Sequence, residues 1–113
     1  MNEITQLLNE IVTQNLYQDL IKQLEKDFLL SNENIEISEK TTPQELISVL
    51  HQKIHDLISF KFNEYLNLLY IIDISENLIK SLDGSDLLIL SKEVSYLILK
   101  REWQKVYYRN LYK

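Results

Sequence analysis

Residues 66–82, LNLLYIIDISENLIKSL, form the most apolar stretch of this chain. Only Asp73-Ile74-Ser75-Glu76 interrupts it, a pattern in which one helix ends and the next begins with almost no loop between them. Asp73 is a candidate cap for the second helix, with Glu76 as its capping-box partner, and Ser75 is a competing cap. The stretch therefore predicts that the chain turns inside its own core.

The composition favours a single all-helical domain. The chain has 113 residues, 45% of them hydrophobic and 26% charged, but only one glycine and one proline. Sheet proteins of this length need many tight turns and normally place glycine and proline in them, so their near absence favours a few long helices. We expect residues 1–113 to form one domain, an all-α bundle of four or five helices.

The chain contains no cysteine, which excludes disulfides, thiolate metal sites and cysteine nucleophiles. This composition suits the cytoplasm. The first residues show no basic segment followed by an apolar one, so we expect no signal peptide. The longest uninterrupted apolar run, Leu68–Ile72, is far too short to cross a bilayer. We therefore expect a soluble cytoplasmic protein with no membrane association.

Two apolar faces follow one another at the amino end. Both have the three- and four-residue spacing of a helix, but at about 100° per residue they point in nearly opposite directions. Either the helix breaks near Asn15, or its first three turns pack against a second subunit, and we favour the second alternative. Residues 1–16 then form a helical extension of the domain. The first face consists of Ile4, Leu7, Leu8, Ile11 and Val12, and the second of Tyr17, Leu20, Ile21, Leu24 and Phe28.

Residues 42–45, TPQE, are the clearest helix start in the sequence. Thr42 and Glu45 have the spacing of a capping box, and Pro43 suits the first helical position, where an N–H would have no intrahelical partner. Before this start, Ile35 and Ile37 alternate with polar residues, which we interpret as an extended linker anchored at two points. A real strand there would have to pair with another chain.

One apolar face continues from Pro43 to Ile72 and predicts a single helix about 45 Å long. Lys61 falls on this face without breaking the pattern. Other apolar residues surround the last turns of this helix, so we expect its end to be enclosed on all sides. These residues are Leu66, Tyr70 and Ile71.

A second long helix is expected from Asp86 to near the C-terminus. Gly84, the only glycine, suits the left-handed position that ends the short helix before it, and Ser85 can cap the helix that follows. The last helix carries two apolar faces, so it lies at the centre of the bundle or forms a dimer interface. We expect the helices from Pro43 and Asp86 to form a long central antiparallel pair. The two faces consist of Leu87, Leu90, Val94, Leu97, Ile98, Tyr108 and Tyr112, and of Leu88, Leu99, Trp103 and Val106.

The sequence does not indicate a reaction centre. His51 and His55 have the spacing that lets two imidazoles share a metal ion, but neither Glu-x-x-His nor His-Glu-x-x-His is present to supply a further ligand. The acids around the two turns within residues 73–86 can all serve as helix caps, and a single glycine cannot form a phosphate-binding loop. We predict that the protein is not an enzyme and has no catalytic, cofactor or metal site.

Residues 100–113 differ in charge from the rest of the chain. They carry +4, whereas the whole chain carries −5, which leaves −9 for residues 1–99. Basic and aromatic side chains alternate here, a combination that suits a protein interface or the binding of phosphates and bases. In a purely structural role, the cations would stabilise the helix end and pair with the acidic body, and the aromatic residues would pack in the core. The candidate interaction surface consists of Arg101, Trp103, Lys105, Tyr107, Tyr108, Arg109 and Tyr112.

Five short motifs occur in a fixed order along the chain: Asp27-Phe28, Pro43-x-Glu45-Leu46, residues 68–76 (LLYIIDISE), Leu97-Ile98 and Arg101-Glu102-x-Gln104-Lys105. In this pattern the chain resembles a family of short uncharacterised proteins from Bacteroidetes. The resemblance covers roughly residues 17–113; residues 1–16 look like an extension outside it, and the tail of this chain is richer in tyrosine than the family pattern. It implies a small cytoplasmic helical protein and transfers no activity or site.

We expect a non-enzymatic interaction or structural protein that forms a homodimer or binds a protein partner. The second face of the last helix, and Ile4–Val12, would form the interface. The alternative is a nucleic-acid or anionic-ligand binder that uses the basic aromatic tail, which the acidic body disfavours. That alternative requires Arg101 and Lys105 to be unpaired within the fold.

Overall fold

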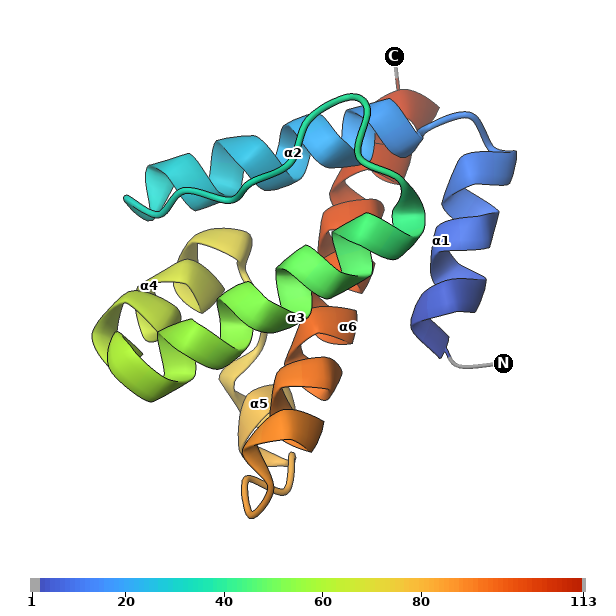
Figure 1. The fold of residues 1–113 in the computed structure, drawn as a ribbon. Helices are drawn as coiled ribbons and strands as arrows, with labels where there is room; N and C mark the ends of the chain where they lie inside the picture. Colours follow the sequence, from blue (N-terminus) through green and yellow to red (C-terminus); the bar gives the residue numbers. More distant parts are fainter. Residues whose placement is uncertain (1–2, 113) are drawn as a thin grey trace.

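The computed structural model describes residues 3–112, and this part of the chain contains six α-helices and no strand. The predicted all-α bundle is confirmed. It has more helices than expected because two of the predicted helices are broken. The helices are α1 (Glu3–Thr13), α2 (Tyr17–Leu30), α3 (Pro43–Phe60), α4 (Phe62–Ile72), α5 (Glu76–Lys80) and α6 (Leu87–Leu111), shown in Figure 1.

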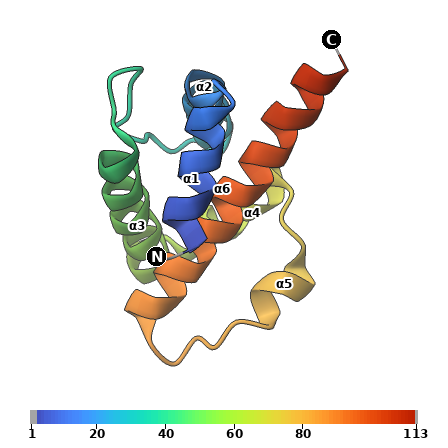
Figure 2. The same ribbon diagram turned by 90° about the vertical axis from the view of Figure 1, so that its right-hand side faces the viewer.

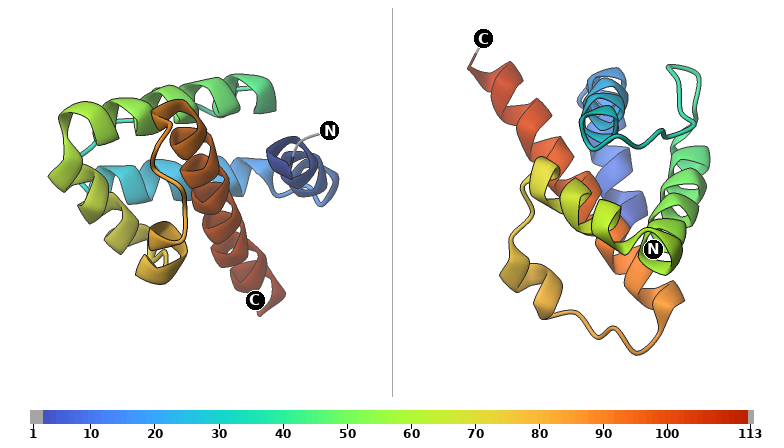
Figure 3. Two further views of the ribbon diagram at one scale, coloured as in Figure 1. Left: turned by 90° about the horizontal axis from the view of Figure 1, so that it is seen from below. Right: turned by 90° about the vertical axis from the view of Figure 1, so that its left-hand side faces the viewer.

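The centre of the bundle is α6, against which α1, α2, α3 and α4 all pack. Its most extensive contact is with α3, so the expected central pair is formed by the expected helices. The two helices cross each other instead of running side by side, as Figures 1 and 3 show. The side chains with no exposed surface at the centre include Phe28, Leu46, Leu50, Ile54, Leu68, Val94 and Ile98.

The helical path is interrupted at Asn15, between α1 and α2. This corrects the prediction that the first three turns pack against a second subunit. Asn15 has a φ of 64°, and the break turns α1 back onto its own bundle. Ile4, Leu8 and Ile11 are consequently buried within this chain. The two apolar faces point in different directions because they belong to two helices that approach the core from different sides.

Three helices end in the same way, although the chain has only one glycine. Asn15, Asn32 and Asp73 follow α1, α2 and α4 with φ values of 64°, 64° and 72°. After α1, the Asn15 N–H donates to the Val12 carbonyl at 3.0 Å and the Leu16 N–H to the Ile11 carbonyl at 3.2 Å, which forms a Schellman motif. Equivalent pairs of bonds follow α2 and α4. Asn and Asp tolerate the left-handed conformation better than other non-glycine residues, so they end these helices in place of glycine.

The corner within residues 66–82 is confirmed as a turn between consecutive helices, but its capping was predicted wrongly. Asp73 ends α4 and does not cap α5, and Ser75 precedes α5 without a side-chain cap. Gly84 does not adopt a positive φ. Asp86, not Ser85, caps α6, because its Oδ1 accepts from the Ile89 N–H at 3.1 Å.

The helix expected to run unbroken from Pro43 to Ile72 is interrupted at Lys61, which lies outside helical geometry with φ −141° and ψ 58°. The break turns α4 away from the direction of α3 (Figure 1). It also lets the Lys61 ammonium reach Glu33 Oε2 at 3.3 Å, while Lys53 binds Glu33 Oε1 at 2.9 Å. Burial raises the pKa of Glu33, but the bonds and charges of the two lysines outweigh it and hold the pKa below its usual value.

The segment between α2 and α3 is an extended linker, as predicted. Ile35 is buried and Ile37 packs against the core. The Tyr17 hydroxyl donates to the Thr41 carbonyl at 2.6 Å and fixes the end of the linker on α2. The predicted capping box is confirmed, since the Glu45 N–H donates to Thr42 Oγ1 and the Thr42 N–H to Glu45 Oε1.

Candidate functional site

The basic residues of the predicted interaction surface are bonded to other parts of the same chain. Arg101 donates through Nη2 to Asp73 Oδ2 at 3.1 Å and through Nε to the Asp73 carbonyl at 3.2 Å. Arg109 Nη1 donates to Gln23 Oε1 at 2.9 Å. Lys105 lies between two acids and is only 20% exposed. The three cations among the seven predicted residues are thus bonded within the chain.

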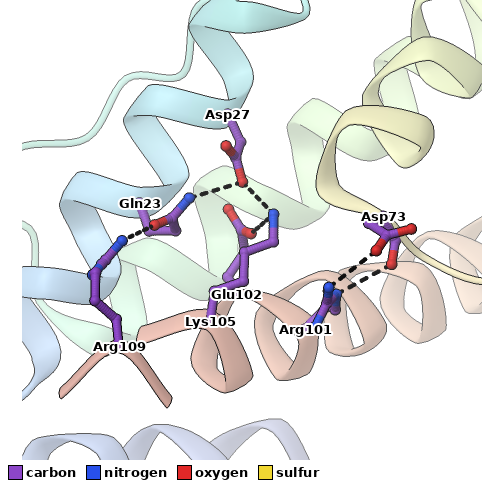
Figure 4. A network of polar contacts seen from close by, with 7 residues as sticks. All are labelled: Gln23, Asp27, Asp73, Arg101, Glu102, Lys105 and Arg109. Atoms are coloured by element: carbon purple, nitrogen blue, oxygen red, sulfur yellow. Dashed lines mark hydrogen bonds and ion pairs between the residues drawn. The ribbon is translucent and has the colours of Figure 1, made fainter. Parts of the chain in front are cut away.

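A buried polar cluster joins α2 to α6 (Figure 4). Lys105 Nζ lies 2.7 Å from Asp27 Oδ2 and 2.9 Å from Glu102 Oε1. Gln23 Nε2 donates to the same Asp27 oxygen at 3.1 Å. The Glu102 side chain has no exposed surface. Two carboxyl groups and one ammonium therefore share a site from which water is largely excluded.

The two acids of this cluster hold their protons differently. Burial raises the pKa of Glu102 to about 9, and its hydrogen bond with Asp27 and the charge of Asp27 raise it further, while the hydrogen bond and charge of Lys105 oppose them. Burial also raises the pKa of Asp27, but hydrogen bonds from Glu102, Lys105 and Gln23 lower it below its usual value. Neither Glu102 oxygen accepts a well-aligned hydrogen bond from the described residues. A neutral Glu102 that donates to an ionised Asp27, beside the Lys105 ammonium, leaves the cluster uncharged overall.

This cluster was not predicted, although one part of it was visible in the sequence. Glu102 comes four residues after Ile98 and four before Val106, both buried in α6, so helical periodicity places it on the inner face. Its partner Asp27 lies in another helix far away in the sequence, and no local pattern connects the two. The Asp27–Glu102–Lys105 cluster is enclosed, so it holds α6 against α2 and offers no access to a substrate.

The aromatic residues of the predicted surface divide between core and solvent. Trp103 is buried, and its ring meets that of Tyr107 edge-on with centroids 5.6 Å apart. Tyr108 is 54% exposed and Tyr112 79% exposed, and Leu111, which was not predicted, is 56% exposed. Figure 2 shows that the carboxyl end of α6 extends beyond the other helices. We call the exposed side chains there the α6 tip, which consists of Tyr107, Tyr108, Leu111 and Tyr112.

A second exposed apolar surface lies between α4 and α5. Phe62, Leu66 and Tyr70 follow one another at intervals of four residues on α4 and are 53%, 47% and 83% exposed. This corrects the prediction that the end of the long helix is enclosed on all sides, because α5 is too short and too distant to cover it. The result is an open groove of about 760 Å³, the α4–α5 groove, lined mainly by apolar side chains that include Phe62, Leu66, Leu69, Tyr70, Ile79 and Leu82.

The two histidines do not form a metal site with other residues. Residues 3–112 contain no group of three or more His, Cys, Asp or Glu side chains placed to hold a metal ion. His51 lines a shallow pocket beside α6, where burial and then the charge of Lys92 lower its pKa. Within the described residues, no helix has the length and apolar character that a membrane span requires.

Comparison with known proteins gives no match: a scan of protein-family models, a search of curated proteins and a search of solved structures all found none. The resemblance to the Bacteroidetes family therefore stays a prediction. Several residues that carry it meet in the fold, since Asp27, Glu102 and Lys105 form the buried cluster and Asp73 binds Arg101.

Proposed function

We propose that this chain is a non-enzymatic interaction module that forms a homodimer through the α6 tip. The observation that supports the proposal is the exposure of four large side chains at a helix end that extends beyond the bundle (Figure 2). Tyrosine contributes a large, rigid contact area and a hydroxyl group, and it is enriched among the residues that dominate binding energy at protein interfaces. The proposal includes the cytoplasm as the compartment, with the absence of cysteine as its support.

Nucleic-acid binding through the same helix has less support. It depended on Arg101 and Lys105 being free to bind phosphates, and both are paired with carboxylates of the same chain. Breaking these pairs to bind an anion would expose Asp73 and Asp27 to that anion. The side chains of the tip that remain free of intramolecular bonds are mostly aromatic and apolar, which favours a protein surface as the partner.

The proposal is tested by light scattering on the purified chain from low to tens of micromolar concentration. We expect a dimer whose dissociation constant rises about tenfold or more in Tyr108→Asp, because a charge then has to be buried at the contact. Leu29→Asp is the matched control, since Leu29 is also exposed but lies at the far end of α2. A wild-type chain that stays monomeric throughout this range would overturn the proposal.

A further inference from the structure

The α4–α5 groove has an apolar floor and an acidic surround. Its floor is formed by the side chains of α4 and α5 described above together with Leu90 from the first turns of α6. Asp73, Glu76 and Lys80 line it, and of these Asp73 is paired with Arg101 and Glu76 lies 3.9 Å from Lys80. Gly84 also lines it, with Asp83 directly before it and Asp86 two residues after it in the sequence. Hydrogen bonds from the backbone and side chain of Ser85 lower the pKa of Asp83, so this carboxylate stays ionised at neutral pH. Residues 76–86, which run along the groove, therefore carry three acids and one lysine beside an apolar surface.

The α6 tip has the complementary properties. Tyr107 and Leu111 lie one helical turn apart, and so do Tyr108 and Tyr112, which places all four on one side of the helix. Lys100 is exposed on the same side, two turns earlier. Arg109 donates to a neutral amide, so no carboxylate among the described residues cancels its charge in a direct ion pair. The tip is thus an apolar strip accompanied by positive charge.

The tip cannot reach the groove of its own chain. α6 is one continuous helix from Leu87 to Leu111, with the groove residue Leu90 at one end and the tip at the other. At the rise of an α-helix, the distance between these ends is roughly 30 Å. A contact between a tip and a groove therefore requires two copies of the chain.

We propose that the α6 tip of one copy docks into the α4–α5 groove of a second copy, and that the second copy returns the same contact. The inference rests on the proposed homodimer and specifies which surfaces meet. The apolar strip covers Phe62, Leu66 and Tyr70, and the positive charges near the tip face Glu76, Asp83 and Asp86. A mutual exchange of tips contains two identical contacts and closes the dimer, so no unpaired tip or groove is left to extend it.

Two variants that block opposite halves of the contact test this arrangement. Leu66→Asp blocks the groove and Tyr108→Asp blocks the tip, and because both side chains are about half exposed, both variants should keep the wild-type helical circular dichroism spectrum and melting behaviour. We expect each variant alone to be monomeric at concentrations where the wild type is a dimer. An equimolar mixture should recover a heterodimer, because the intact tip of one variant fits the intact groove of the other. Analytical ultracentrifugation with one variant carrying a fluorescent label measures this recovery.

The other outcomes separate the inference from the proposed function. If Tyr108→Asp is monomeric but Leu66→Asp remains a dimer, the tips pair with each other, so this inference fails and the proposed homodimer stands. If the mixture stays monomeric although each variant is folded, the inference fails as well. A wild-type chain that is monomeric at every concentration overturns both. Tyr70→Asp provides a second groove variant with the same expected result, since Tyr70 is the most exposed residue of the groove stripe on α4.

Discussion

Replacing Glu102 with glutamine tests whether this buried residue is neutral in the folded protein. Because burial raises the pKa of Glu102 to about 9, folding at pH 7 has to protonate a side chain that is ionised in the unfolded chain, where its pKa is near 4.5. At roughly 1.4 kcal/mol per pH unit, this proton uptake lowers the free energy of unfolding by about 3 kcal/mol at pH 7. The cost at pH 7 is insensitive to the folded pKa as long as that pKa stays well above 7. Glutamine cannot ionise, and its amide can still donate to Asp27.

The expected result is a difference between Glu102→Gln and wild type that depends on pH. The contribution of a raised pKa to stability is complete below 4.5 and is lost as pH rises toward 9, so the two proteins should differ little in pH dependence below pH 4.5. Between pH 4.5 and pH 7, the free energy of unfolding of the variant should rise by about 3 kcal/mol relative to that of the wild type. Urea unfolding followed by circular dichroism at several pH values measures this gain. A constant difference between the two proteins from pH 5 to pH 8 would show that Glu102 is ionised in the fold and would refute the reasoning.

The matched control is Asp27→Asn, which leaves Lys105 beside Glu102 alone. Glu102 should then ionise to pair with Lys105, so its pKa should fall and the loss of stability between pH 4.5 and pH 9 should become smaller. The variant should still be destabilised at pH 5, because it loses the bonds that lower the pKa of Asp27. An unchanged pH dependence in this variant would contradict the proposed sharing of a proton between the two acids.

Three further predictions concern helix ends and ion pairs. Because Asn15 has a φ of 64°, Asn15→Gly should be more stable than Asn15→Ala by about 1 kcal/mol. Gly84→Ala should be more stable than the wild type by about 0.5 kcal/mol, because a Cβ at this position meets only Leu90 at 3.9 Å. Thermal unfolding of these three variants and the wild type measures both differences. Asp73→Asn should change stability by less than about 0.5 kcal/mol because its pair with Arg101 is partly exposed, but Asp73→Ala should cost about 1 kcal/mol, and equal losses would rule out the left-handed backbone as the cause. Glu33→Gln should cost about 2 kcal/mol at pH 7 and progressively less as pH falls below 4.5, which urea unfolding at pH 3.5 and pH 7 can compare.

The start of α3 could be predicted from the sequence, whereas the ends of α1 and α4 could not. Thr42, Pro43 and Glu45 act within one turn, so their pattern determines the capping geometry almost alone. Asn15 and Asp73 are ambiguous, because the same residue types that accept hydrogen bonds at a helix start also tolerate the left-handed backbone of a helix end. Their assignment depends on the direction in which the next helix finds apolar surface to bury, which a local pattern does not contain.

For the candidate surfaces too, the sequence indicates local features but not the contacts made with distant parts of the chain. The exposure of Tyr108 and Tyr112 follows from the position of α6 within the bundle, and the tail was singled out from composition alone. The basic residues of the tail were predicted to lie on the interaction surface, but Lys105 pairs with Asp27 in α2 and Arg101 with Asp73 after α4, and both partners are distant in the sequence. The α4–α5 groove could not be predicted, since apolar periodicity identifies a face as one to be covered but does not say whether a five-residue α5 is long enough to cover it.

The cluster and the α6 tip have separable effects on stability and on assembly. A buried group that lowers stability can still fix how two helices align, and in this fold the Asp27–Glu102–Lys105 cluster holds α6 in register with α2. Because the register determines where the tip extends, the cluster acts on assembly through position and not through contact. Glu102→Gln keeps the shape of the cluster, so it should raise stability and leave the dimer dissociation constant unchanged. Leu66→Asp should do the reverse, with unchanged stability and a weaker dimer. If both variants changed stability and assembly together, the fold and the interface would share one set of contacts, and the separation argued from the enclosure of Glu102 and the exposure of Leu66 would be wrong.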